Sequence, residues 1–184
     1  MKTKLFFASL ILLVAFTSCK KEANQKQDEV KPAEVETKNN NFQVTLTVTV
    51  KTDDHFQLYY SQDAYEVPYK EENSVWTEVK ANENPQDIVF NLPEDVIPNY
   101  IRIDFGTNEE QKEIIIKNFK MKYYSKSFEA KDSLFFNYFI PNDCVKIVDK
   151  KNSIIQNFKT KEGKYDPLFY SEKALYDQIQ LIVK

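Results

Sequence analysis

Four aromatic side chains in the segment 56–108 fall in a loop or on the outward side of a strand pattern. They are Tyr59, Tyr65, Tyr69 and Trp76. Sugar rings present apolar C–H faces, and flat exposed aromatic rings are the side chains that stack on them. If Tyr59 and Trp76 share a sheet face, they form a stacking platform for a glycan. The alternative is that Trp76 packs into a second core face of its strand.

Arg102 is the one arginine of the chain. Its planar guanidinium can hold a carboxylate through two parallel hydrogen bonds. Two interpretations stay open, a structural ion pair with a nearby Asp or Glu and a clamp for a ligand. Gln57, Asn73 and Glu78 are polar neighbours that can hydrogen-bond sugar hydroxyls. Together with the four aromatic residues, Arg102 completes the set of candidate ligand-binding residues.

The sequence predicts no catalytic residue, no cofactor and no metal. It holds no GxSxG or HExxH motif, no nucleophile–base arrangement and only two glycines, too few for a phosphate cradle. Asp53, Asp54 and Asp104 offer oxygens to calcium, but their spacing fits no binding loop, and turn formation explains them better. The single histidine, His55, supplies no zinc site by itself.

These candidate residues depend on β-strands to position them. Residues 42–50 (FQVTLTVTV) alternate strictly between apolar and polar side chains. Four shorter runs follow, FQLYYS, VWTEV, DIVFNL and YIRIDF, and Pro85 and Pro93 are expected to bracket the third. Polar connections rich in Asn, Asp, Glu and Pro separate these runs. The pattern predicts an all-β fold, an antiparallel and jelly-roll-like β-sandwich.

The rest of the chain is expected to extend this sandwich. In residues 112–124 the apolar parity changes near Lys117, which predicts a β-bulge. SLFFNYFI is expected to form a short helix or loop at one end of the sandwich, and VKIVDK and SIIQNF two short strands. We expect Ser171 to cap a short helix and QIQLIV to form a last strand. Residues 42–184 are thus predicted to be one domain with one or two short helices near its C-terminus.

The first 41 residues carry a targeting pattern. Two lysines precede an apolar stretch of twelve residues, too short to cross a bilayer as a stable helix, and Ser18 and Cys19 follow. This resembles the type II signal peptide of bacterial lipoproteins. The resemblance implies a signal peptide over residues 1–18 and a lipid on Cys19 that anchors the protein in the outer membrane of the cell envelope, on the periplasmic side or the surface. The alternative is an ordinary secretory signal with an incidental cysteine.

Residues 19–41 and the net charge limit the classes of partner that this chain is expected to have. After Cys19 the segment has no aromatic residue and no apolar periodicity, so we expect a disordered tether. The mature chain holds 23 basic and 28 acidic side chains once two lysines leave with the signal peptide, a net charge of −5. Because such a surface repels phosphate backbones, nucleic acid is not an expected partner. The other cysteine, Cys144, is expected to be a buried small hydrophobe.

The segments YKEENSV, IVFNLP and IRIDFGTN, within residues 42–124, resemble a β-sandwich module of exported bacterial proteins tied to surface polysaccharide. That module is similar to galactose-binding-like jelly rolls and carbohydrate-binding modules. The resemblance implies a lipid-anchored, non-catalytic binding module with glycan as its ligand. The alternative is a structural or accessory subunit that docks onto another envelope protein through its exposed aromatic residues. A hydrolase would need a pocket with two acidic groups of shifted pKa.

Overall fold

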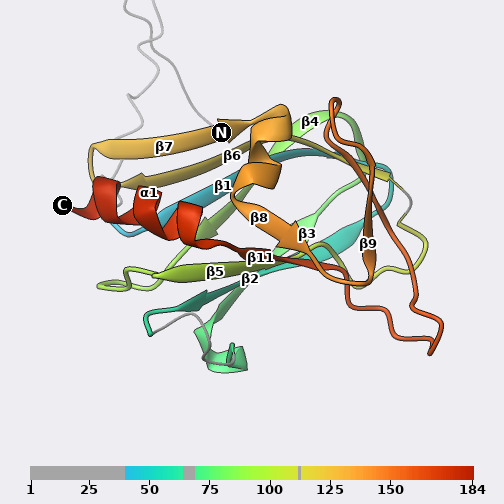
Figure 1. The fold of residues 1–184 in the computed structure, drawn as a ribbon, viewed down its shortest axis with the longest axis horizontal. Coiled ribbons are helices and arrows are strands. Elements are labelled where there is room, and N and C mark those ends of the chain that lie inside the picture. The colour runs from blue at the N-terminus through green and yellow to red at the C-terminus, as the bar shows by residue number, and fades with distance from the viewer. Residues whose placement is uncertain (1–39, 64–68, 112) are drawn as a thin grey trace, which may run out of the picture. The chain divides into compact units, whose positions relative to one another are not determined.

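The computed structural model describes residues 40–63, 69–111 and 113–184. These residues form two antiparallel β-sheets around one hydrophobic core (Figure 1). The prediction of an all-β sandwich with a short C-terminal helix is confirmed. The predicted signal peptide over residues 1–18, Cys19, most of the tether and Tyr65 lie outside the described residues.

The first sheet, here called sheet A, contains six strands among the described residues. In spatial order they are β4 (Asn82–Asn91), β1 (Gln43–Val50), β6 (Glu113–Tyr123), β10 (Ile154–Asn157) and β9 (Val145–Asp149), with β7 (Lys126–Lys131) also paired to β6. Pro85 lies inside β4 and does not bracket it as expected. Because β4 is an edge strand, a residue without an N–H donor is tolerated there.

The second sheet, here called sheet B, contains five strands among the described residues. In spatial order they are β3 (Ser74–Val79), β2 (Asp54–Ser61), β5 (Tyr100–Asp104), β11 (Leu168–Ser171) and β8 (Phe139–Pro141). A short 3₁₀ helix, η1 (Glu71–Asn73), precedes β3. Sheet B is therefore assembled from strands far apart in the sequence, since β11 pairs with β5 on one side and with β8 on the other.

The inward faces of the two sheets follow the predicted alternation. In β1, the side chains of Val44, Leu46 and Val48 are fully buried, and the threonines between them point to the other face. The predicted bulge in β6 is confirmed, because the pairing with β1 skips Lys117. This extra residue lets isoleucines on one side of the bulge and Phe119 on the other face the same core.

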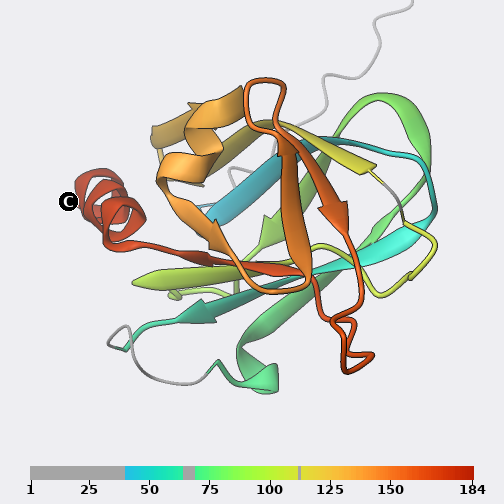
Figure 2. The ribbon, with the colours of Figure 1, turned by 45° about the vertical axis from the view of Figure 1, so that its right-hand side comes forward.

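Two helical segments cover the core beside the strands. The 3₁₀ helix η2 (Asp132–Asn137) packs against β6, β7 and β8, so the first part of the run SLFFNYFI forms the expected short helix, whereas Phe139 and Ile140 belong to β8. The helix α1 (Lys173–Val183) packs against β6, β7 and β11, and Figure 2 shows it beside the ends of the sheets. Cys144 is buried as expected. No helix within the described ranges has both the length and the apolar composition of a membrane span.

The prediction of a last strand in QIQLIV was wrong, because these residues belong to α1. The segment fits both periods, but the buried side chains are Leu175, Ile179 and Ile182, which are spaced for a helix, whereas Leu181 is exposed. The cap prediction was also wrong. Ser171 ends β11, and its Oγ accepts a hydrogen bond from the backbone N–H of Ile101 at 2.8 Å.

Candidate functional site

The outer face of sheet B brings most of the predicted site residues together. In β2, Phe56 and Leu58 face the core, so the alternation turns Gln57 and Tyr59 outward. Gln57 pairs with Trp76 of β3 on one side and with Asp104 of β5 on the other. Tyr59 pairs with Arg102 in the same way. Strand register therefore places Tyr59, Trp76 and Arg102 in one layer of side chains.

Arg102 is held by carboxylates within this layer. Its Nε donates to Oδ1 of Asp104 at 2.7 Å and its Nη2 to Oδ2 of Asp104 at 2.5 Å. The same Nη2 lies 3.5 Å from Oδ1 of Asp166. The guanidinium carbon lies 4.5 Å from the centroid of the Tyr59 ring, a cation–π contact. Of the two interpretations of Arg102, the structure thus contains the ion pair.

Burial perturbs the ionisable groups around Arg102. The Asp104 side chain is 15% exposed. This burial raises the pKa of Asp104 to about 6, because Arg102 only partly offsets the loss of hydration, while Asp166 and Glu71 add repulsion. Burial, together with the hydrogen bond to Glu71, also raises the pKa of Tyr59 to about 12. A carboxyl group that titrates near pH 6 is therefore part of this face.

Glu71 connects the short helix η1 to the outer face of sheet B. Its Oε2 accepts a hydrogen bond from Tyr59 Oη at 2.5 Å, and its Oε1 accepts from Gln57 Nε2 at 2.9 Å and from Trp76 Nε1 at 3.3 Å. The bonds from Tyr59 and then Trp76 lower the pKa of Glu71. Glu71 therefore fixes the orientation of the indole ring of Trp76.

The predicted aromatic residues divide into covered and exposed rings. Tyr69 packs edge-on against Tyr59, with ring centroids 6.3 Å apart, and stacks on Tyr170 at 6.2 Å. Tyr59 is accordingly only 8% exposed. Trp76 is 49% exposed, so the alternative that it packs into a second core face is wrong. Tyr69 is half-buried, so among the described rings of the predicted set Trp76 is the most exposed.

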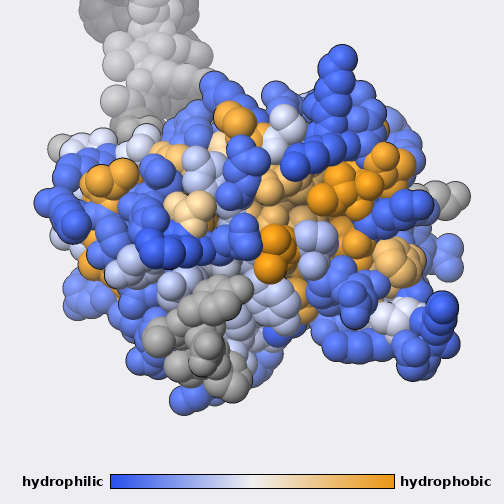
Figure 3. Space-filling model, viewed as in Figure 1, coloured by the Kyte–Doolittle hydropathy of each residue, from blue (hydrophilic) through white to orange (hydrophobic). Residues whose placement is uncertain are grey.

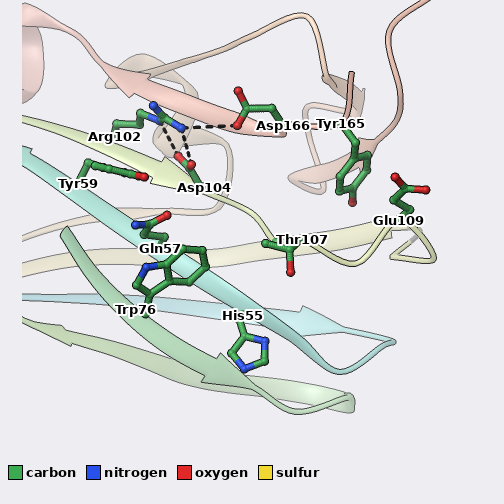
Figure 4. Close-up of a pocket in the computed structure, with 11 residues that line it drawn as sticks. His55, Gln57, Tyr59, Trp76, Arg102, Asp104, Thr107, Glu109, Tyr165 and Asp166 are labelled. Atoms are coloured by element: carbon green, nitrogen blue, oxygen red, sulfur yellow. Dashed lines mark hydrogen bonds and ion pairs between the residues drawn. The ribbon is translucent and has the colours of Figure 1, made fainter. Parts of the chain in front are cut away.

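A pocket of about 290 Å³ lies beside Trp76 (Figure 4). Figure 4 shows Trp76 and His55 on one side of it and Tyr165 and Asp166 on the other. The lining residues are His55, Gln57, Tyr59, Trp76, Arg102, Asp104, Gly106, Thr107, Glu109, Tyr165 and Asp166. The pocket thus combines a half-exposed indole with amide, hydroxyl and carboxylate groups.

The loop after β5 forms one end of the pocket and depends on Asp54. Asp54 Oδ1 accepts hydrogen bonds from the backbone N–H groups of His55 at 2.8 Å, Thr107 at 2.8 Å and Asn108 at 3.1 Å. Gly106 has φ +108°, and a Cβ on it would lie 2.1 Å from Asp54 Oδ2. Asp54 therefore shapes a turn, and within the described ranges no cluster of three or more His, Cys, Asp or Glu is placed to hold a metal ion.

Sequence reasoning missed half of the pocket. Thr107 and Glu109 follow directly on YIRIDF, so their position after an outward-facing strand was an available signal. Tyr165 and Asp166 lie about 60 residues further along, and the pairing of β11 with β5 brings Asp166 to Arg102 and Tyr165 to the backbone of Asn108. No local pattern reveals these contacts.

Compared with protein-family models, curated proteins and solved structures, the chain matches none of them. The resemblance to carbohydrate-binding sandwiches accordingly stays a prediction.

Proposed function

We propose that this chain is a non-catalytic binding module of the bacterial cell envelope, and that the pocket on the outer face of sheet B binds a glycan. The single observation that carries this proposal is the half-exposed ring of Trp76, which is fixed by Glu71 at the side of a pocket lined by hydrogen-bonding groups. Sugar recognition requires this combination of an apolar stacking surface and fixed polar partners.

The dimensions and the rigidity of the pocket support a small ligand. A volume of about 290 Å³ lies at the lower end of the range for small-molecule sites, with room for about one or two sugar rings. The lining residues on β2, β3 and β5 sit on hydrogen-bonded strands, and Arg102 is fixed by two carboxylates. A site built on such strands loses little conformational entropy when a ligand binds.

The envelope location is the second part of the proposal. It rests on the lipoprotein-like pattern that ends at Cys19, with the polar segment behind it as a tether. Mass spectrometry of the N-terminus of the protein purified from bacterial membranes tests it. We expect a lipid-modified Cys19 as the first residue, and an unmodified Cys19 would overturn the envelope anchor.

A glycan microarray probed with residues 20–184, the mature chain without its lipid, tests the binding function. We expect reproducible binding to a group of related glycans and at least a tenfold loss of affinity in Trp76→Ala, about 1.4 kcal/mol. Tyr124→Ala is the matched control, because Tyr124 is an exposed aromatic residue outside the pocket. Binding that Trp76→Ala leaves intact would remove the pocket from the proposal.

A second candidate function, a structural or accessory subunit, is favoured by a different surface. Figure 3 shows hydrophobic side chains gathered over β8 and β9, and the exposed apolar residues of that part of the chain include Ile140, Val148 and Phe158. Such a surface suits docking onto another envelope protein. Affinity purification from cross-linked cells would then recover a stoichiometric partner that is lost in Val148→Glu and retained in Trp76→Ala.

A further inference from the structure

The charge of the pocket restricts the class of glycan that it can bind, an argument that rests on the proposed function. Among the residues that the structure describes, three carboxylates line the pocket, those of Asp104, Glu109 and Asp166, against one permanent cation, Arg102. Two donors of that guanidinium already bind Asp104, and Nη2 also faces Asp166. An acidic group on a ligand would therefore approach like charges and meet a cation that is already paired.

Lysines near the pocket do not reverse this balance. Lys159 pairs with Glu109 at 2.6 Å and Lys164 with Asp166 at 2.8 Å, but neither lysine lines the pocket. Both lysines are well exposed, as is Glu109, so solvent and salt weaken the field of these groups, whereas Asp104 is only 15% exposed and its charge is screened least. Glu71, which bonds two of the lining side chains, adds a further carboxylate. In the described part of the chain, four carboxylates around the pocket thus stand against three lysine or arginine side chains, with His55 as a further lining residue.

Uncharged sugars match the groups that the pocket does offer. A sugar hydroxyl donates well to a carboxylate oxygen, and each oxygen of Asp104 has lone pairs beyond the one that Arg102 uses. Thr107 adds a hydroxyl to the pocket lining, and Trp76 supplies the stacking surface. A hydroxylated, uncharged ring can therefore form hydrogen bonds without breaking the ion pair.

We infer that the pocket binds uncharged glycans and rejects glycans that carry carboxylate or sulfate groups. The lone arginine of the chain suggests the opposite, an anion clamp, when it is considered without its partners. Its bidentate pairing with Asp104 is what removes it from that role.

A microarray of matched pairs tests this inference with the mature chain, residues 20–184. The pairs are polygalacturonate and its methyl ester, carboxymethylated and unmodified cellulose, and sulfated and desulfated galactan, so that charge changes on a constant backbone. We expect the bound members to be uncharged, with affinity at least tenfold above that of their acidic counterparts. Equal or tighter binding of acidic members overturns the inference and leaves the proposed function standing. Failure to bind any glycan on the wider microarray overturns both.

Two variants show whether the carboxylates cause the selection. Asp104→Asn removes a buried charge and releases the guanidinium, so the ratio of acidic to uncharged binding should rise at least tenfold. Asp166→Asn, at a more exposed position that leaves the Arg102–Asp104 pair intact, should raise the ratio in the same direction and keeps the test valid if the first variant fails to fold. Asp87→Asn on the exposed outer side of sheet A is the charge-matched control. An unchanged ratio in both pocket variants contradicts the inference.

Discussion

The outer faces of the two sheets differ in what lies over them. On sheet A, Gln43 and Thr47 bond their cross-strand neighbours Asn91 and Asp87 at exposed positions. On sheet B, Gln57 occupies the same kind of outward position yet is 2% exposed, because η1 packs against β2 and Glu71 and Ser74 bond the amide. Alternation alone makes both faces polar. On sheet B, η1 packs against β2, and the pKa values of Tyr59 and Asp104 are raised there. On sheet A, Gln43 and Thr47 bond at exposed positions and face solvent.

The largest effect is expected for Gly106→Ala, at the loop beside the pocket of sheet B. The new Cβ would collide with the carboxylate of Asp54, which anchors the loop at the pocket, and the residue would be held at φ +108°. We expect a loss of about 3–5 kcal/mol in the free energy of unfolding, measured by urea denaturation. Gly163→Ala is the control. Its φ is +82°, and no atom outside its chain neighbours lies within 4 Å of an added Cβ, so only about 1 kcal/mol of backbone strain is expected. Equal losses would show that the contact with Asp54 does not matter.

The second test is the pH dependence that Asp104 contributes. Its pKa of about 6 in the folded protein lies above its value of about 3.9 in an unfolded chain. The contribution to stability is therefore complete below about pH 4 and is lost as the pH rises through 6, at most about 3 kcal/mol. The groups that face it are Arg102, Tyr59, Asp166 and Glu71.

Asp104→Asn isolates this contribution, because every other titrating group is common to both proteins. The free energy of unfolding of the original chain minus that of the variant should increase as the pH is lowered from 7.5 to 4.5, as measured by urea denaturation at each pH. A flat difference would mean that Asp104 ionises as it does in the unfolded chain.

A matched pair of substitutions compares the two faces directly. Gln57→Ala removes a buried amide that bonds Glu71 and Ser74, so we expect a loss of about 1–3 kcal/mol. Gln43→Ala removes a bond at an exposed position and should change the stability by no more than about 0.5 kcal/mol. The fluorescence of Trp76, the one tryptophan, reports unfolding in both variants. Similar losses of stability in the two variants would show that the bonds of Gln57 to Glu71 and Ser74 do not stabilise the fold.

The smallest effect is expected for Glu71→Gln. The amide keeps one oxygen to accept from Trp76 Nε1 and Gln57, and its NH₂ can donate to the hydroxyl of Tyr59. We expect a loss of about 1 kcal/mol or less and an unchanged emission maximum of Trp76. Glu71→Ala removes all three bonds and should shift the emission. If both variants behave alike, Glu71 does not orient the indole.

Sequence patterns predicted the structure best where apolar and polar residues alternate along a strand that has one buried face. The alternation in residues 42–50 and the parity change at Lys117 predicted the buried faces of β1 and β6, because a side-chain period of two leaves little freedom once one face is buried. QIQLIV failed because its apolar residues satisfy both a strand and a helix, and packing on β6, β7 and β11 decided between them.

The sequence by itself determined the all-β fold, the outward direction of Tyr59, Trp76 and Arg102, and the presence of a single guanidinium. Only the tertiary structure decided that this guanidinium is held by Asp104 and Asp166 and that Trp76 stays half exposed. The physical reason is that periodicity is a local property of the chain. The neighbours of an outward side chain come from strands and loops that can be 60 residues away.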